Sequence, residues 1–253
     1  TAGIASDPDE DSDIYWLWLT SKVTDEFTAD DYDFLEYDGE SNYAGELPYQ
    51  YGQTNFFIPD VGSQNAANEL SQGHLKRHTS GFQLNYDNGD MYGNAQYNYQ
   101  WGALATDRIK AWGYAVNIGA RFDKDGMNHD LGIGIREASG ETDPNDGEST
   151  RFRPLFSGSA HSYNGIQDYV GWSNSTALFI KYAFNPMEKL RMTTTWTDFQ
   201  RNEKNDSWYN DAGAVLRTGK AVMLYQKDEG TELSSPIKEG VSGSSDIGHE
   251  VDF

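Results

Sequence analysis

Alternating apolar and polar residues run through most of this 253-residue chain, and this period of two predicts β-strands. The clearest example extends from Arg108 to Phe122. Successive side chains of a strand point to opposite faces, so the segment predicts one apolar face and one face of small and polar side chains. The apolar face would carry Trp112, Tyr114, Val116, Ile118, Ala120 and Phe122, and the other face Ala111, Gly113, Ala115, Asn117, Gly119 and Arg121.

Further segments of the same kind bring the predicted strands to about eight. They lie at 14–24, 81–86, 94–101, 130–136, 178–184, 190–197 and 247–253. The first of them is less regular, because Trp16 and Trp18 interleave with other apolar residues, but we still expect a strand there. The polar faces of these segments are rich in Gly, Asn, Gln and Thr, whereas a soluble antiparallel sheet would favour charged residues on its solvent face.

The connections between these segments alternate between short and long. Short turns are predicted at Asn88-Gly89, from Asp123 to Gly126, and at Asn185-Pro186. Asn88-Gly89 is in addition a type I′ hairpin signal, because both central positions of that turn need a positive φ. Long connections are expected at about 25–78, 139–174 and 202–245, with a modest one near 102–107. Short turns on one side and long loops on the other are typical of outer-membrane barrels.

The apolar face of the 108–122 segment has the height of a lipid bilayer. Ten residues separate Trp112 from Phe122, which corresponds to about 25 Å at a strand tilt of roughly 40°. Aromatic residues at both ends of such a face match the girdles of membrane barrels. We therefore predict an all-β fold, an antiparallel transmembrane β-barrel of the outer-membrane type. The alternative is a soluble antiparallel sheet with one face on a core, which gives the same alternation.

Composition narrows the range of functions. Tyr (16), Phe (12) and Trp (7) supply much of the apolar content, as in membrane-interface girdles. A net charge of −21 and a pI near 4.4 argue against nucleic acid as a partner, because phosphate binding needs clustered Lys and Arg. The absence of cysteine excludes disulfides and thiolate metal sites from this sequence. No apolar stretch approaches the roughly 20 residues of a spanning helix, so any membrane crossing would use strands.

For a channel, the candidate site is the lining of its lumen. The polar faces place four cations there, Arg121, Arg136, Lys181 and Arg191. Opposing carboxylates are Asp130 and, on the last predicted strand, Glu250 and Asp252. Because arginine forks pair with carboxylates in bidentate fashion, a polymer of uronic acids would suit this lining. The alternative is that these charges pair across the lumen and brace the barrel.

Metal binding and catalysis receive little support. Asp123, Asp125 and Asp130 resemble the opening of an EF-hand calcium loop, but the bidentate Glu at its end is missing, and a tight hairpin turn explains the same residues. The five histidines show no metal spacing, and no enzymatic motif stands out. We therefore expect no cofactor, with calcium as a weak alternative, and no enzymatic activity.

Several short motifs are similar to those of the alginate-export family of bacterial outer-membrane proteins. They are RHTSGF at 77–82, IKAW at 109–112, ASG at 138–140, DPNDG at 143–147, FRPLF at 152–156 and DIGHEVDF at 246–253. The resemblance implies a single-chain barrel of about eighteen strands that passes an anionic polysaccharide through a basic constriction. It also implies that Arg151 and Arg153, within a long loop, fold toward the mouth of the channel.

On this interpretation residues 1–253 form one barrel domain that is incomplete at both ends, with strands upstream and a final pair downstream. The alternative is that about eight strands close by themselves, which would leave an interior filled by side chains. The expected function is an outer-membrane channel or exporter in contact with lipid, which passes an anionic polysaccharide or a related hydrophilic solute. The competing hypotheses are a barrel that serves as a scaffold around a partner protein of the envelope, and a secreted soluble β-protein that binds or cleaves sugars.

Overall fold

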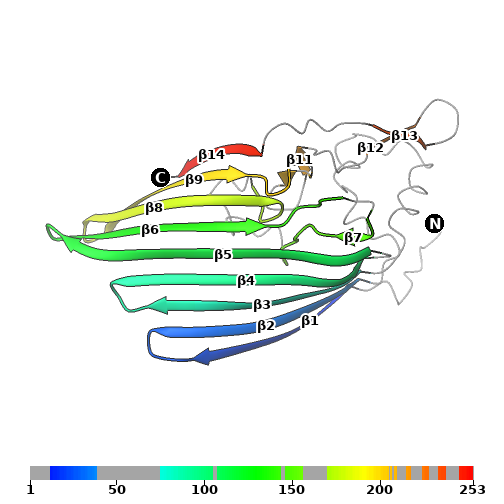
Figure 1. Ribbon diagram of the computed structural model, residues 1–253. Coiled ribbons are helices and arrows are strands. Elements are labelled where there is room, and N and C mark those ends of the chain that lie inside the picture. Colours follow the sequence, from blue (N-terminus) through cyan, green and yellow to red (C-terminus); the bar gives the residue numbers. More distant parts are fainter. Residues whose placement is uncertain are drawn as a thin grey trace, which may run out of the picture.

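The computed structural model is an antiparallel β-sheet whose strands follow one another in chain order (Figure 1). It describes residues 12–38, 75–104, 107–143, 146–155, 170–204, 206, 208–209, 215–217, 224–227, 233–237 and 245–252. The long strands are β1 (Ser12–Lys22), β2 (Phe27–Asp38), β3 (Leu75–Asp87), β4 (Met91–Leu104), β5 (Asp107–Lys124), β6 (Met127–Ala138), β8 (Ser175–Met187), β9 (Leu190–Gln200) and β14 (Asp246–Asp252). Short strands are β7 (Glu148–Ser149), β10 (Trp208–Tyr209), β11 (Val215–Arg217), β12 (Leu224–Lys227) and β13 (Leu233–Ile237).

The main sheet has the order β1-β2-β3-β4-β5-β6-β8-β9-β14, and β7 adds to β5 in parallel. β10 pairs with β11 and β12 pairs with β13 in two separate ribbons. The all-β, antiparallel prediction is confirmed. Within the described residues β1 and β14 are the two edges, and the sheet is not closed. No helix in the described part of the chain is long and apolar enough to cross a membrane.

Among the long strands, β2 was not predicted, and neither were the short strands β7 and β10 to β13. Sequence analysis placed a long connection at about 25–78, but Phe27–Asp38 forms β2, paired along its length with both β1 and β3. Its alternation is hidden because both faces carry acidic residues, with Asp31 and Asp33 on one face and Asp30 and Glu36 on the other. The connection that follows β2 is therefore 39–74, which lies outside the described residues.

Two turns differ from their predictions. Gly89 has a φ of 93°, but Asn88 does not have a positive φ, so this turn is not type I′. The Asn88 side chain instead accepts hydrogen bonds from the backbone of Asp90 and Met91. The pair of positive φ values occurs at Asp125 (55°) and Gly126 (75°), between β5 and β6.

The Asn185-Pro186 turn was also predicted wrongly. These residues belong to β8, within an irregularity of its pairing with β9, and the turn is at 188–189. Proline lacks the N–H that a regular ladder needs, so it is tolerated at such an irregularity.

The two ends of the sheet differ as expected for a membrane barrel. Four short turns, at 23–26, 88–90, 125–126 and 188–189, lie at one end, here called the turn end. The connections after β2, β4, β6 and β9 lie at the other, here called the loop end. The connections after β2, β6 and β9 are long. The predicted modest connection near 102–107 is reduced to residues 105–106, because 102–104 belong to β4 and Asp107 begins β5.

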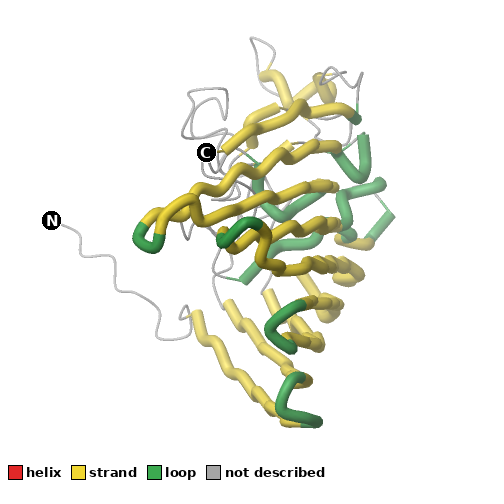
Figure 2. Tube along the Cα trace, turned by 90° about the vertical axis from the view of Figure 1, so that its left-hand side faces the viewer, coloured by secondary structure: helices red, strands yellow, loops and turns green. Residues whose placement is uncertain are grey.

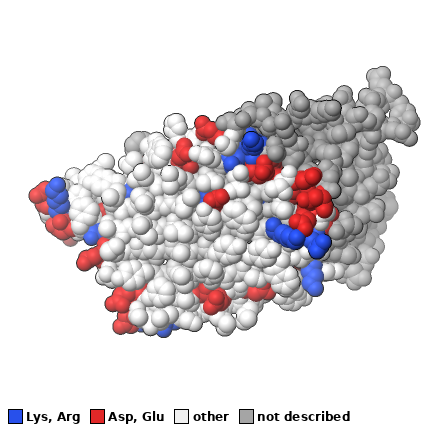
Figure 3. Space-filling view, in the orientation of Figure 1, with Lys and Arg blue, Asp and Glu red and all other residues white. Residues whose placement is uncertain are grey.

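One face of the sheet, here called the outer face, is apolar and exposed. From β3 to β9 most of its side chains are large and apolar, although Ser80, Gly93 and Thr194 also lie on it, and Ile118 near its middle is 58% exposed. In the view of Figure 3, charged side chains gather mainly toward the two ends of the sheet and most of the area between them is uncharged. An exposed apolar face of this extent is incompatible with contact with water alone and fits a lipid-facing surface.

The opposite, inner face contains glycines that aromatic rings of other residues cover. The Tyr92 ring lies over Gly119 and Gly132, the Phe179 ring over Gly134, and the Tyr32 ring over Gly81. A Cβ atom at Gly81, Gly119 or Gly134 would lie less than 3.0 Å from the ring, and one at Gly132 would lie 2.8 Å from the Tyr92 hydroxyl. These glycines therefore allow bulky rings to lie flat against the inner face and to pack without side chains beneath them.

Part of the long connection after β6 packs against the inner face near the loop end. The Phe152 ring lies over Gly113 of β5, and it clusters with Trp172 and with the alanines Ala111, Ala115 and Ala138. The backbone N–H of Phe152 donates to the carbonyl of Ser139 at 3.0 Å. The described segments of this connection thus form a small core on the inner face of the sheet, which is curved (Figure 2).

Candidate lumen lining

The inner face of β3 and β4 is a network of amide side chains. Asn94 donates to Asn85 at 2.5 Å, and Gln83 donates to the same Asn85 oxygen at 3.0 Å. Gln100 is fully buried and donates to Thr79 at 3.1 Å. Amides keep their hydrogen-bonding capacity without a charge, so they provide a polar wall that does not bind one sign of ion tightly.

Asp130 of β6 is the centre of the main charged cluster. Its carboxylate accepts hydrogen bonds from the Tyr92 hydroxyl at 2.7 Å and from Arg191 Nη2 at 2.6 Å. The ammonium group of Lys181 lies 4.0 Å away. The Asp130 side chain is only 9% exposed, whereas those of Lys181 and Arg191 are 37% and 49% exposed. The cluster therefore buries its anion and presents its two cations.

Arg121 occupies a different position. Its guanidinium group forms a bidentate pair with Asp87, with N···O distances of 2.8 and 3.0 Å, and lies 4.5 Å from the centre of the Tyr92 ring. It also donates to the carbonyl of Gly89 in the β3–β4 turn. Arg121 therefore braces the turn end of the sheet.

Arg136 and Glu250 are two further charged residues predicted for the lining, besides Asp252, which faces Thr195 of β9. The Arg136 guanidinium lies 4.9 Å from the centre of the Phe179 ring, a cation–π contact between β6 and β8. Glu250 is buried on β14 opposite Thr197 of β9. Both residues are on the inner face, but neither belongs to the cluster around Asp130.

Arg151 and Arg153 flank Phe152 in the connection that packs on the inner face. Arg151 is buried, donates to the Tyr209 hydroxyl and lies 4.4 Å from the centre of that ring. The backbone of Arg153 is held by Gln100 at two points, since its N–H donates to Oε1 at 2.9 Å and its carbonyl accepts from Nε2 at 2.5 Å. Arg151 thus belongs to the structure of the loop, whereas Arg153 is fixed to the wall through its backbone.

The connection after β6 is also held at β7, where Glu148 forms an ion pair with Lys110 of β5. The hydrogen bond from the Lys110 ammonium group lowers the pKa of the Glu148 carboxyl. The pair supports the parallel register in which Arg108 faces Glu148 and Ile109 faces Ser149. This contact anchors the start of the segment that carries Arg151 and Arg153.

The weak calcium candidates are not brought together. Asp125 is part of the β5–β6 turn, Asp123 faces Asn128, and Asp130 is engaged by Tyr92 and Arg191. Among the described residues, no group of three or more His, Asp or Glu side chains is placed to hold a metal ion. The hairpin turn itself is at 125–126, and Asp123 belongs to β5.

Sequence reasoning missed the inner-face residues that β2 contributes. Glu36 pairs with the buried Arg77 of β3 through Nε at 3.0 Å and Nη2 at 2.5 Å. Asp30 accepts from Thr20 at 2.6 Å and from Trp18 Nε1 at 3.3 Å. The available signal was the run of aromatic residues interleaved with acids at 27–38, which has the length of a strand but no alternation.

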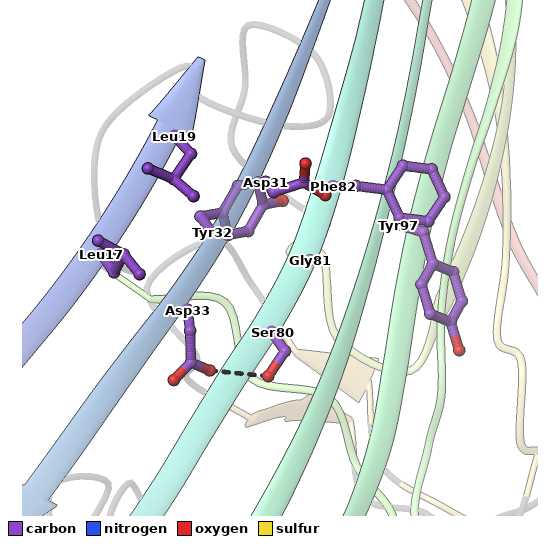
Figure 4. Close-up of a pocket in the computed structure, with 9 residues that line it drawn as sticks. All are labelled: Leu17, Leu19, Asp31, Tyr32, Asp33, Ser80, Gly81, Phe82 and Tyr97. Carbon is purple, nitrogen blue, oxygen red and sulfur yellow. Dashed lines mark hydrogen bonds between the residues drawn. The ribbon is translucent and has the colours of Figure 1, made fainter. Parts of the chain in front are cut away.

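The outer face over β1 to β4 holds a pocket of about 440 Å³ with polar groups in it. Asp33 accepts from Ser80 at 2.7 Å and lies 3.1 Å from Nδ1 of His78, which stacks on Trp101. Figure 4 shows the Asp33–Ser80 bond, with the side chains of Leu17 and Leu19 on β1 beside it. The Asp31 carboxylate forms no hydrogen bond or ion pair within the described residues. This part of the outer face is therefore less apolar than the rest.

An antiparallel sheet with an apolar outer face, a polar inner face, short turns at one end and long connections at the other defines a section of an outer-membrane β-barrel. The model of the alginate-export family matches residues 10–253, and the chain belongs to that family. The family's general role is polysaccharide export, which is transport and not catalysis. No curated protein and no solved structure matches the chain.

Proposed function

We propose that this chain forms part of the wall of an outer-membrane channel, and that its inner face guides an anionic polysaccharide such as a uronate polymer through the passage. The observation that carries the proposal is the cluster at Asp130. Lys181 and Arg191 converge on this buried carboxylate but keep 37% and 49% of their side chains exposed. Two cations are thus positioned by one internal anion and still accessible from the lumen side.

The chemistry of the cluster suits a passing carboxylate. Asp130 offsets only one of the two positive charges, so β6, β8 and β9 together present a local excess of positive charge. An exposed ion pair contributes about 1 kcal/mol or less, which is enough to attract a uronate unit without trapping it. Weak, repeated binding is what conduction along a channel requires.

The surrounding wall supports the same function. Thr193, Thr195 and Thr197 of β9 and the amides of β3 and β4 line the inner face with neutral hydrogen-bonding groups. Such groups exchange readily with water and with sugar hydroxyls. The loop segment 146–155 lies against this wall near the loop end, so it narrows the space through which a polymer would pass.

The test is single-channel conductance of the full-length protein in planar bilayers, with oligouronate added as a blocker. We expect Lys181→Gln and Arg191→Gln each to weaken the block by about twofold to fivefold, the range of an exposed ion pair. Arg121→Gln serves as the matched control, because Arg121 is paired with Asp87 at the turn end and should have little effect. An unchanged block in both cluster variants would contradict the proposal.

The scaffold alternative makes a different prediction. A barrel that surrounds a partner protein would show little conductance when purified alone and would retain that partner through detergent extraction. Conductance with a saturable uronate block, from a preparation that contains one polypeptide, would exclude it.

A further inference from the structure

The inner face of β1 and β2 differs from the rest of the lining because it is aromatic. Trp16 is in register with Phe34, and Trp18 with Tyr32. We call these four residues the inner aromatic patch. From β3 to β9 the inner face instead carries mainly Gly, Ala, Thr, amides and the charges described above.

Hydrogen bonds establish that the patch faces the lumen side. The Tyr32 hydroxyl donates to Asn98 at 2.6 Å and accepts from Gln96 at 2.8 Å, and both amides belong to the inner face of β4. Trp18 stacks on Tyr32 with ring centres 4.7 Å apart and planes at 14°. Pairing with β2 fixes the faces of β1, so a further strand beside β1 would leave Trp16 and Trp18 on the same side.

The patch is both ordered and exposed. Trp18 Nε1 donates to Asp30 at 3.3 Å and to Thr20 at 3.2 Å, which holds the indole ring in place. Phe34 makes edge contacts with Trp18 and Tyr32, with ring centres 6.3 and 5.8 Å apart. Trp16 is nevertheless 68% exposed and Trp18 40% exposed. Two large rings are therefore exposed on the inner face, whereas the Phe152 and Trp172 rings of the loop core are buried.

Pyranose rings have the chemistry that such a surface binds. One face of a pyranose carries several C–H groups, and these are attracted to the electron-rich face of an aromatic ring while both surfaces leave water. The hydroxyl groups at the edge of the sugar need polar partners close by. Asp30 and Asn85, 3.4 Å apart beside the patch, are such partners.

We infer that the inner aromatic patch, with Trp16 and Trp18 as its exposed rings, binds the sugar rings of a transported glycan by stacking. The inference rests on the proposed function and deepens it. The Lys181–Arg191 cluster recognises the carboxylate of a sugar unit, and the patch recognises its ring. Stacking does not depend on the charge of the sugar, so the patch accepts neutral and acidic glycans alike.

The test measures block of the full-length channel by two probes, a neutral β-1,4-glucan hexasaccharide and an oligouronate of the same length. We expect Trp16→Ala and Trp18→Ala each to weaken both blocks by about threefold to tenfold, as the loss of one aromatic contact implies. Trp16→Phe should restore most of the block, because it keeps a stacking ring. Trp196→Ala is the matched control, since Trp196 lies on the outer face and should leave both blocks unchanged.

The two proposals fail separately. If Lys181→Gln weakens the uronate block but neither tryptophan variant changes either block, the patch inference is overturned and the proposed function stands. If the unmodified channel shows no uronate block but binds the neutral probe through Trp16, the patch stands and the anionic solute is overturned. Altered migration of unheated protein on a gel identifies any variant that has not folded, and for such a position Trp16→Leu or Trp18→Leu, which keeps apolar bulk but no aromatic ring, decides the outcome.

Discussion

The sectors β1–β3 and β5–β9 belong to one sheet but differ on both faces. On β5–β9 the outer face is mainly apolar, and its exposed side chains include Val116 on β5 and Met192 on β9. On β2 the outer face carries Asp31 and Asp33 at the middle of the strand. On the inner face, β5–β9 present cations around Asp130 and β1–β2 present exposed aromatic rings. The inner face of one sheet therefore has a charged sector and an aromatic sector, which β3 to β5 separate.

The two sectors are also stabilised in different ways. The inner face of β5–β9 packs through aromatic rings on glycines and through the loop core at Phe152. The inner face of β1–β2 packs through aromatic rings on one another. Substitutions in the two sectors test this difference.

Gly134→Ala should produce the largest loss of stability. A Cβ atom there would meet the Phe179 ring and would lie 2.8 Å from the carbonyl oxygen of Val116, so the backbone itself would have to shift. We expect a loss of about 1–3 kcal/mol in the free energy of unfolding. Gly93→Ala is the control, because its nearest atoms are 3.4 and 3.6 Å away. Urea unfolding in lipid vesicles measures both, and equal stability would refute ring-on-glycine packing.

Asp130→Asn should strengthen the uronate block by about twofold to fivefold, because it releases Lys181 and Arg191 from their internal anion. Asp87→Asn removes a carboxylate that pairs with Arg121 and accepts from the Gly89 backbone at the turn end, so its effect should be smaller. Block constants of the two variants are compared at equal ionic strength. A weaker block in Asp130→Asn would mean that Asp130 is needed to position the cations more than it masks them.

Asp31→Leu should stabilise the protein by about 1 kcal/mol, because it replaces a carboxylate on a lipid-facing surface by an apolar side chain. Asp33→Leu should gain less, since it also removes the acceptor of Ser80 and the partner of His78. Unfolding in vesicles gives both values. Destabilisation by Asp31→Leu would show that this part of the outer face is not in contact with lipid.

The smallest effect concerns the anchor of the loop at β7. Because pairing with Lys110 lowers the pKa of Glu148, its stabilising contribution is present above the pKa of the unfolded chain and is lost as pH falls through the lowered value. We expect backbone hydrogen exchange at 146–150 to be faster in Glu148→Gln than in the unmodified protein at neutral pH. The difference should disappear in acid, and a difference that persists there would refute the role of the pair.

Much of the sheet was predictable because its strands keep one face apolar. Val116, Ile118, Ile133 and Ile180 fall where the period of two places them. β2 was not predictable in this way, because acids occupy both of its faces and the partners that satisfy Asp30 and Glu36 lie on other strands. The predicted turn at Asn185-Pro186 failed for a related reason, since a pairing irregularity accommodates the proline without ending the strand.

The candidate site was predictable only in its composition. The alternation placed Asp130, Lys181 and Arg191 on one face, but it contained no information on which of them meet. Arg121 has the same alternation and yet braces a turn, because Asp87 comes close to it only after β4 has paired with both β3 and β5. The inward packing of Phe152 and the two-point contact of Gln100 with Arg153 have no periodic signal at all, since they join a loop to a strand.

The central claim is that the inner face of this sheet lines water and the outer face contacts lipid. The chain has no cysteine, so a single introduced cysteine reports one position without background. Three consecutive threonines of β9 offer a matched set, since Thr193 and Thr195 share the inner face with Lys181 and Thr194 shares the outer face with Tyr182.

In intact outer-membrane vesicles, a membrane-impermeant thiol reagent should modify Thr193→Cys and Thr195→Cys rapidly and Thr194→Cys slowly. Rapid modification of Thr194→Cys, together with protection of its two neighbours, would contradict the account.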